Sequence, residues 1–143
     1  MDGKQMSVWS RVVGAVWIQS YVTDERYNKN INKLRKHIGK PVKFNSKNRI
    51  TKLPRGSEGS LQYNIQKISK DEIILNVYGN LRDFSNIDTV YDWLNEHINN
   101  KYLNSINMEI VSTAISMRTT FGERVIFTFN DTTDKWEVSP VAG

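Results

Sequence analysis

The chain has 143 residues, of which 38% are hydrophobic and 24% are charged, and this composition is typical of one soluble globular domain spanning 1–143. It contains no cysteine and only two histidines, which excludes disulfides, iron–sulfur clusters, thiolate zinc sites and a cysteine nucleophile. No apolar run is long enough to span a membrane, and the first residues lack the pattern of a signal peptide, so we expect a cytoplasmic protein.

The net charge of +5 is unevenly distributed along the chain. Eleven lysines and arginines and no acidic residue lie between Arg26 and Arg55, whereas the rest of the chain has nine basic and fifteen acidic residues. Such a run favours an anionic partner, although an amphipathic helix can carry the same charge on a solvated face. We interpret the helical half of the run as solvated surface and the loop half as the better candidate for a site.

Residues 7–21 are rich in Val, Ile, Trp and Tyr and are predicted to form a long central strand. Their apolar side chains fall on both faces, so the strand could be covered on both sides. Gly14 indicates a bulge or a close approach by a neighbour. Thr23 is then expected to cap a helix that ends near Gly39 and Pro41. The apolar stripe of this helix consists of Tyr27, Ile31, Leu34 and Ile38.

Residues 40–59 have few apolar anchors and are predicted to form a long loop. Alternating polarity over 60–68 predicts a half-buried strand, and 73–80 form its expected hairpin partner. A second helix follows, with Ser85 as its expected N-cap and Asp88 in a variant of the capping box. The apolar stripe of this second helix consists of Ile87, Val90, Tyr91, Leu94 and Ile98.

Three more strands are expected over 107–118, 123–130 and 134–139, the last of them short. The predicted order is therefore β-α-β-β-α-β with an extra C-terminal strand or hairpin. This order is the ferredoxin-like arrangement, an α+β fold in which two helices cover one face of an antiparallel sheet.

The most pointed local signal is the stretch LPRGSEGSL at 53–61. Its glycines allow positive φ, so backbone amides could form an anion-binding nest, or the stretch could simply be a turn into the next strand. Arg82 precedes a helix whose first amides could face an anion, although Asp83 could pair with it or help to cap the helix. The candidate ligand-binding residues are Lys47, Arg49, Lys52, Arg55, Gly56, Ser57, Gly59 and Arg82.

No catalytic, metal or phosphate-binding signature is evident in the chain. His37 and His97 each flank an apolar stripe, and Asp88 and Asp92 share one helix face, which is more typical of solvated surface than of a cation site. We therefore predict a protein without enzymatic activity, cofactor or metal. Spacing in the sequence leaves open a catalytic cluster that only the fold would assemble.

Aromatic residues on the expected strands allow two further interpretations. They could form the base-stacking face of an RNA-recognition sheet, but the glycine-containing signature of those domains is missing. They could instead anchor the interface of a homo-oligomer. The residues concerned are Trp9, Trp17, Tyr21, Tyr63 and Tyr78.

Three landmarks resemble a group of small uncharacterised proteins from tailed bacteriophages: VWSRVVGAVWI at 8–18, LPRGSEGSL at 53–61 and GNLRDFSNIDTVYDWLN at 79–95. The resemblance transfers no activity and no catalytic residue. It implies a context, namely a non-enzymatic protein that binds a host component in the host cytoplasm.

We therefore expect a non-catalytic binding protein whose partner is anionic, either a nucleotide-type ligand or an acidic surface of a host protein, and whose basic loop forms the site. The alternative is general nucleic-acid binding, in which the face of the first helix and the basic loop contact phosphates.

Overall fold

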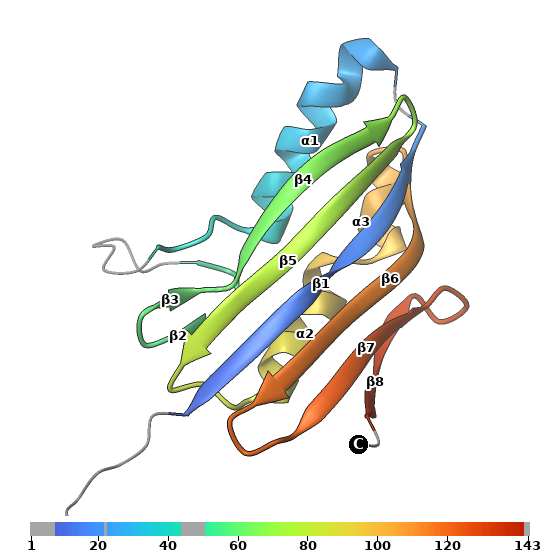
Figure 1. Ribbon diagram of the computed structural model, residues 1–143. Coiled ribbons are helices and arrows are strands. Elements are labelled where there is room, and N and C mark those ends of the chain that lie inside the picture. Colours follow the sequence, from blue (N-terminus) through green and yellow to red (C-terminus); the bar gives the residue numbers. More distant parts are fainter. Residues whose placement is uncertain (1–7, 22, 44–50, 142–143) are drawn as a thin grey trace, which may run out of the picture.

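The computed structural model describes residues 8–21, 23–43 and 51–141. Together they form a six-stranded sheet with helices on one face and a small two-stranded hairpin at one end (Figure 1), so the predicted α+β character is confirmed. None of the helices in these residues is long and apolar enough to cross a membrane. The elements are β1 (Trp9–Ser20), α1 (Asp24–Ile38), β2 (Arg55–Gly56), β3 (Gly59–Ser60), β4 (Gln62–Ser69), β5 (Glu72–Arg82), α2 (Ile87–His97), α3 (Asn100–Ser105), β6 (Met108–Thr119), β7 (Arg124–Asn130) and β8 (Lys135–Pro140).

The sheet has the strand order β4-β5-β1-β6-β7-β8, and each strand runs antiparallel to its neighbours. The predicted central position of β1 is confirmed, because β5 and β6 flank it on its two edges. The expected hairpin of β4 and β5 is also present. The C-terminal hairpin of β7 and β8 extends the sheet beyond β6 (Figure 1).

The two faces of the sheet differ sharply, because side chains alternate along each strand. On β1, Val12, Val16 and Ile18 are buried beneath the helices, whereas Trp9 is 40% exposed and Val13 is 52% exposed. Within the described residues, only one face is therefore covered. We call the other side the open face; its central strands present the odd-numbered residues of β1, the even-numbered residues of β5 and the even-numbered residues of β6 from Ser112 to Arg118.

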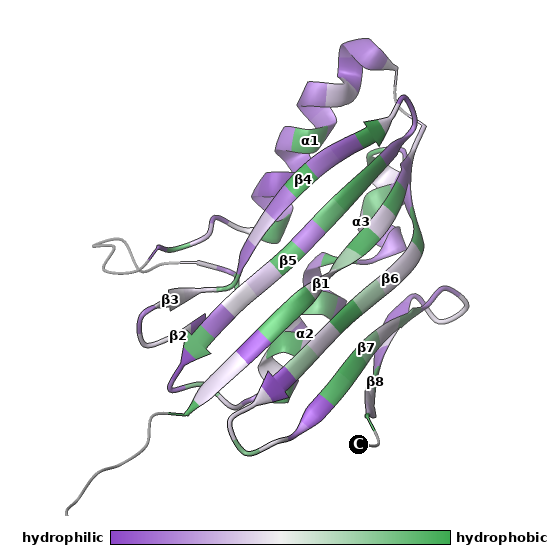
Figure 2. Ribbon diagram, viewed as in Figure 1, coloured by the Kyte–Doolittle hydropathy of each residue, from purple (hydrophilic) through white to green (hydrophobic). Residues whose placement is uncertain are grey.

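Helices α1 and α2 bury the apolar stripes that the periodicity predicts. Ile31, Leu34 and Ile38 of α1 and Val90 and Leu94 of α2 all lie in the core. Burying a side chain of this size stabilises the fold by roughly 1.5–3 kcal/mol. The remaining surface of α1 is hydrophilic (Figure 2) and carries much of the basic run.

The C-terminal hairpin is tied to this core by Trp136 of β8. Its side chain is completely buried, and its indole Nε1 donates a hydrogen bond to the carbonyl oxygen of Ile98 at 2.7 Å. A buried indole N–H needs such a partner. The predicted last strand is thus an integral part of the sheet.

Several local predictions are corrected by the structure. The N-cap of α2 is Asn86 rather than Ser85, because Asn86 Oδ1 accepts a hydrogen bond from the amide of Thr89 at 3.2 Å. Thr23 does occupy the N-cap of α1, but its side chain makes no capping hydrogen bond. The expected loop at 40–59 contains the β2–β3 hairpin, and the short helix α3 was not predicted.

Gly14 lies where β1 and β6 approach each other closely. A close approach was one of the two explanations that the sequence offered for this glycine, and a bulge was the other. A Cβ at this position would lie 2.0 Å from the carbonyl oxygen of Ala114 on β6. The irregularity in the pairing lies further along, where the register between β1 and β6 shifts after Trp17 and leaves Val111 as an extra residue on β6.

Candidate functional site

The predicted basic loop lies partly outside the residues that the structure describes. Lys47 and Arg49 lie outside the described residues. The ammonium group of Lys52 turns back toward α1 and donates a hydrogen bond to the carbonyl oxygen of Lys36 at 3.1 Å. Arg55 is the first residue of the short strand β2. The structure therefore places Lys52 and Arg55 on two ordered segments, and their role in binding stays a prediction.

The glycine stretch forms the β2–β3 hairpin, which packs against the end of β5. The amide of Ser57 donates to the carbonyl oxygen of Arg82 at 2.8 Å, so this amide is already used within the chain. A Cβ on Gly56 would lie 2.4 Å from that same oxygen, which explains why glycine is needed there. Gly59 has a φ of 157°. The backbone of this stretch is that of a turn into the next strand, which is the alternative to an anion-binding nest that the sequence allowed.

Arg82 lies beside this hairpin and forms an ion pair with Glu58. Its guanidinium carbon also lies 5.9 Å from the centre of the Trp9 ring, which is within the range of a cation–π contact. The structure thus brings Gly56, Ser57 and Arg82 together, but their hydrogen-bonding groups largely serve each other. Anion binding by this set remains a prediction.

A different group of cations lies on the open face. Arg11 of β1 is directly opposite Arg118 of β6, and Arg118 is directly opposite Arg124 of β7. All three side chains are exposed. Adjacent strands are about 4.8 Å apart, so the three residues span roughly 10 Å across the sheet. We call Arg11, Arg118 and Arg124 the arginine row.

The arginine row is electrostatically unusual. Among the residues that the structure describes, no carboxylate lies within ion-pair distance of Arg11, Arg118 or Arg124. Like charges directly opposite each other on neighbouring strands destabilise a sheet. One side chain is held in place, since Arg11 Nε donates to Asn80 Oδ1 at 3.2 Å. The row therefore concentrates positive charge that an external anion would neutralise.

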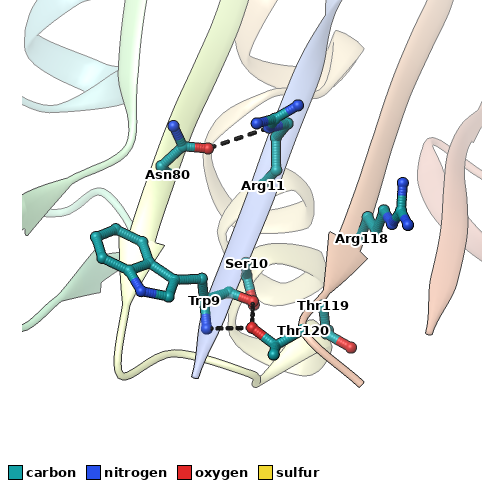
Figure 3. Close-up of a pocket in the computed structure, with 7 residues that line it drawn as sticks. All are labelled: Trp9, Ser10, Arg11, Asn80, Arg118, Thr119 and Thr120. Carbon is teal, nitrogen blue, oxygen red and sulfur yellow. Dashed lines mark hydrogen bonds between the residues drawn. The ribbon is translucent and has the colours of Figure 1, made fainter. Parts of the chain in front are cut away.

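A pocket of about 420 Å³ lies at one end of the row (Figure 3). Its walls come from β1, from β5 and from the end of β6, and they include Trp9, Arg11, Asn80, Arg118 and Thr120. The backbone at its base is fixed, because the amide of Trp9 donates to Thr120 Oγ1 at 2.6 Å and the amide of Thr120 donates to the carbonyl oxygen of Trp9 at 2.8 Å.

A second hollow, of about 370 Å³, adjoins the first. Arg11 and Arg118 line both hollows, and Arg124 and Ile126 line the second one. The two hollows thus form a strip across three strands, and their linings together include all three arginines of the row. A ligand lying in this strip would meet donors on every strand it crosses.

Exposed aromatic rings lie beside this strip. Trp9 is two residues from Arg11 on β1, and Tyr78, which is 43% exposed, is two residues from Asn80 on β5. Tyr78 lies directly opposite Val13. The sequence prediction that aromatics occupy one sheet face holds for these residues but is wrong for Tyr63. That ring packs against the core, and its hydroxyl donates to the carbonyl oxygen of Gly39 at 2.8 Å.

The opposite end of the open face is acidic. Glu72, Gln19 and Glu109 lie in register on β5, β1 and β6. Both carboxylates already accept hydrogen bonds within the chain, Glu72 from the Trp17 indole at 2.7 Å and Glu109 from the Tyr21 hydroxyl at 3.2 Å. The bond to Glu109 raises the pKa of Tyr21. The face is therefore polarised, with its cations at one end and its anions at the other.

The two histidines meet on the helical side of the sheet. The His37 ring stacks on Tyr102 with 3.5 Å between ring centres, and the His97 ring lies 5.4 Å from that of His37. Burial lowers the pKa of both histidines, and the charge of Lys52 lowers each pKa further. Within the described part of the chain, no group of three or more His, Cys, Asp or Glu side chains could hold a metal ion.

Sequence reasoning missed the arginine row because its members are far apart in the chain. Each arginine is a single cation in an otherwise ordinary strand. The available signal was the alternation of each strand, which places Arg11, Arg118 and Arg124 on the side opposite the buried residues. Comparisons of this chain with models of protein families, with curated proteins and with solved structures found no match.

Proposed function

We propose that this chain is a non-catalytic binding protein that holds an anionic, phosphate-bearing partner on the arginine row of its open face. One observation carries the proposal. Three arginines stand in register on adjacent strands, exposed, and without an ion-paired carboxylate among the described residues. Their mutual repulsion costs stability, and a bound anion would reverse that cost.

Arginine suits this task better than lysine. Its guanidinium group is planar, stays charged at physiological pH and presents several N–H donors that match two oxygens of one phosphate. All three arginines line the strip formed by the two hollows, so a ligand lying there has an arginine on each of three adjacent strands. The basic surface of α1 offers lysines on a convex helix, and we assign to it the steering of anions toward the protein.

The arrangement of strands bears on the proposed fold type and context. We infer a ferredoxin-like topology, supported by the order β4-β5-β1-β6 and by the helical connections from β1 to β4 and from β5 to β6. The resemblance to tailed-bacteriophage proteins supports a host component as the partner, bound in the host cytoplasm.

The experiment that tests the function compares two triple variants with the same loss of charge. The first is Arg11→Gln/Arg118→Gln/Arg124→Gln on the open face, and the matched control is Lys29→Gln/Lys33→Gln/Lys36→Gln on α1. The probe is inorganic polyphosphate, measured by isothermal titration calorimetry at about 50 mM salt, where electrostatic binding is strong.

The arginine triple variant is expected to weaken binding by at least about tenfold, because charge-assisted hydrogen bonds each contribute roughly 1.5–3 kcal/mol. The lysine triple variant is expected to change the affinity by less than about threefold, the effect of net charge alone. Equal losses in the two variants, or a larger loss in the lysine variant, would assign the site to the basic helix and loop instead.

A further inference from the structure

We infer that the anionic partner is single-stranded nucleic acid, which lies across β1, β6 and β7 with its phosphates on the arginine row and its bases on neighbouring aromatic rings. This inference rests on the proposed function and adds the class of ligand.

Two exposed aromatic rings lie beside the arginine row. Trp9 and Tyr78 lie on the two central strands, β1 and β5, and flank the Arg11–Asn80 pair on the open face. Both rings are substantially exposed. Proteins that bind single strands combine a cationic groove for the backbone with exposed rings on which unpaired bases stack. A small inorganic anion would make no use of these rings.

The charge pattern of the open face favours one direction for the nucleic-acid strand. The acidic end of the face, at Glu72 and Glu109, repels a polyanion that runs along β1. A path across the strands, from the pocket at Trp9 to Arg124, avoids those carboxylates and meets one arginine on each of three strands. The ligand path therefore follows the arginine row rather than the strand axis.

The open face suits an unpaired strand better than a duplex. Bases in a duplex are paired and stacked on each other, so their flat faces are closed to protein side chains. The described part of the open face is a sheet surface and places no helix over the row that could enter a major groove (Figure 1). The aromatic rings thus favour an unpaired strand.

A second copy of this chain is the competing occupant of the open face. A two-fold axis through its centre would place the arginine row of one copy over the acidic end of the other. One observation favours nucleic acid: both glutamates already accept hydrogen bonds within the chain, so they are engaged before a second copy could meet them. The middle of the face is mixed, because the exposed Val13 and Ile126 flank the polar Ser116, and the test below therefore includes a dimer among its outcomes.

The test is fluorescence anisotropy with three labelled probes of about ten nucleotides each: a single-stranded oligonucleotide, the same backbone without bases, and the duplex. The proteins are the native chain, Tyr78→Ala, Tyr78→Phe as the matched control, and Arg118→Gln. Tyr78 is exposed, so its replacement is expected to leave the fold intact.

We expect the native protein to bind the single strand at least about fivefold more tightly than the abasic backbone, since one stacked base contributes a factor of this size or more. Tyr78→Ala should lose that advantage, and Tyr78→Phe should keep it. Arg118→Gln should weaken the binding of both probes.

Three other outcomes would overturn the nucleic-acid assignment, and they differ in what they mean for the proposed anion binding. If the abasic backbone binds as tightly as the single strand and Arg118→Gln weakens both, then anion binding stands and the nucleic-acid assignment is overturned. If neither probe binds, the nucleic-acid assignment fails, and the polyphosphate titration decides separately whether the arginine row binds anions. If sedimentation shows a native dimer that Arg118→Glu dissociates, and the native dimer binds no oligonucleotide, then the open face is an interface between copies of this chain.

Discussion

At the residue scale, Arg118 has the most unfavourable surroundings on the open face, because it faces Arg11 on one side and Arg124 on the other. We expect Arg118→Gln to raise the free energy of unfolding of the unliganded protein by about 0.2–1 kcal/mol, since it removes two like-charge cross-strand pairs. Urea denaturation at low salt measures this change. A loss of stability would show that Arg118 supports the fold and does not serve a ligand.

Gly14 illustrates the opposite constraint, a position where the fold tolerates no side chain. Gly14→Ala is expected to destabilise the protein by about 1–3 kcal/mol or more, because the added Cβ overlaps the backbone of β6 at Ala114. Gly79→Ala is the matched control on β5. Its Cβ would meet Leu61 Cδ1 at 3.2 Å and Leu61 Cα at 3.4 Å, which is a much smaller overlap than the one at Gly14, so thermal denaturation should show the smaller loss.

The two histidines make stability depend on pH. Burial lowers the pKa of His37 and His97 in the folded protein, so the unfolded chain binds more protons just below the ordinary value of about 6.5. Their contribution to stability is fully present above that pH and is lost as the pH falls. We expect the melting temperature to decline between pH 7.5 and pH 5.5, and to decline less in His37→Phe/His97→Phe. An equal decline in the variant would assign the effect to other groups.

At the scale of elements, two adjacent residues, Ser85 and Asn86, are candidates for the N-cap of α2. Asn86→Ala is expected to cost about 1 kcal/mol, because it removes the hydrogen bond to the amide of Thr89. Ser85→Ala should cost much less, since Ser85 is exposed and precedes the cap. Urea denaturation of the two variants compares them directly. A larger loss of stability in Ser85→Ala than in Asn86→Ala would show that Ser85 is the N-cap, as the sequence predicted.

The periodic elements could be predicted from the sequence because burial imposes their spacing. The stripe of α1 and the alternation of β1 follow from having one face against the core. The cap of α2 was placed one residue too early, because Ser85 and Asn86 are both good capping residues and only the backbone decides between them. The β2–β3 hairpin was missed because its strands are two residues long and carry no alternation.

Alternation alone places each arginine on the exposed side of its strand, but the sequence does not show that the three lie next to one another, because that depends on pairing between strands. Arg118 and Glu109 are nine residues apart, so strict alternation would put them on opposite faces of β6. The extra residue at Val111 changes this parity, and both side chains reach the open face. The sequence indicated an anionic partner from the basic run, but the register of β1, β6 and β7 places a second group of exposed cations on the other face of the sheet.

At the scale of the whole molecule, positive charge lies on two sides of the protein. Helix α1, which carries the basic surface, lies on the helical side of the sheet (Figure 1). The arginine row lies on the open face. The net charge of +5 attracts any polyanion over a distance of roughly one Debye length, about 8 Å at physiological salt. Long-range attraction alone therefore does not identify the site. A test must distinguish cations that only attract the polyanion from those that contact its phosphates.

Salt dependence makes that separation for a single-stranded ligand. The logarithm of its affinity is expected to fall linearly with the logarithm of the salt concentration, with a slope of about −0.7 for each phosphate neutralised. Removing all three arginines of the row should make this slope shallower by roughly 2. Anisotropy titrations at several salt concentrations measure the slope, and an unchanged slope in the arginine variant would mean that phosphates contact other cations.

The central claim is that the arginine row is the anion site, and the most direct measurement maps the bound anion onto the native protein. We would titrate ¹⁵N-labelled protein with inorganic polyphosphate and follow backbone and side-chain N–H signals by two-dimensional NMR. If the arginine row is the anion site, we expect the largest chemical-shift changes at Trp9, Arg11, Arg118 and Arg124. The side-chain Nε–H signals of the arginines should be among the signals that move. Shifts concentrated in α1 and the β2–β3 hairpin, with the open face unchanged, would contradict this claim.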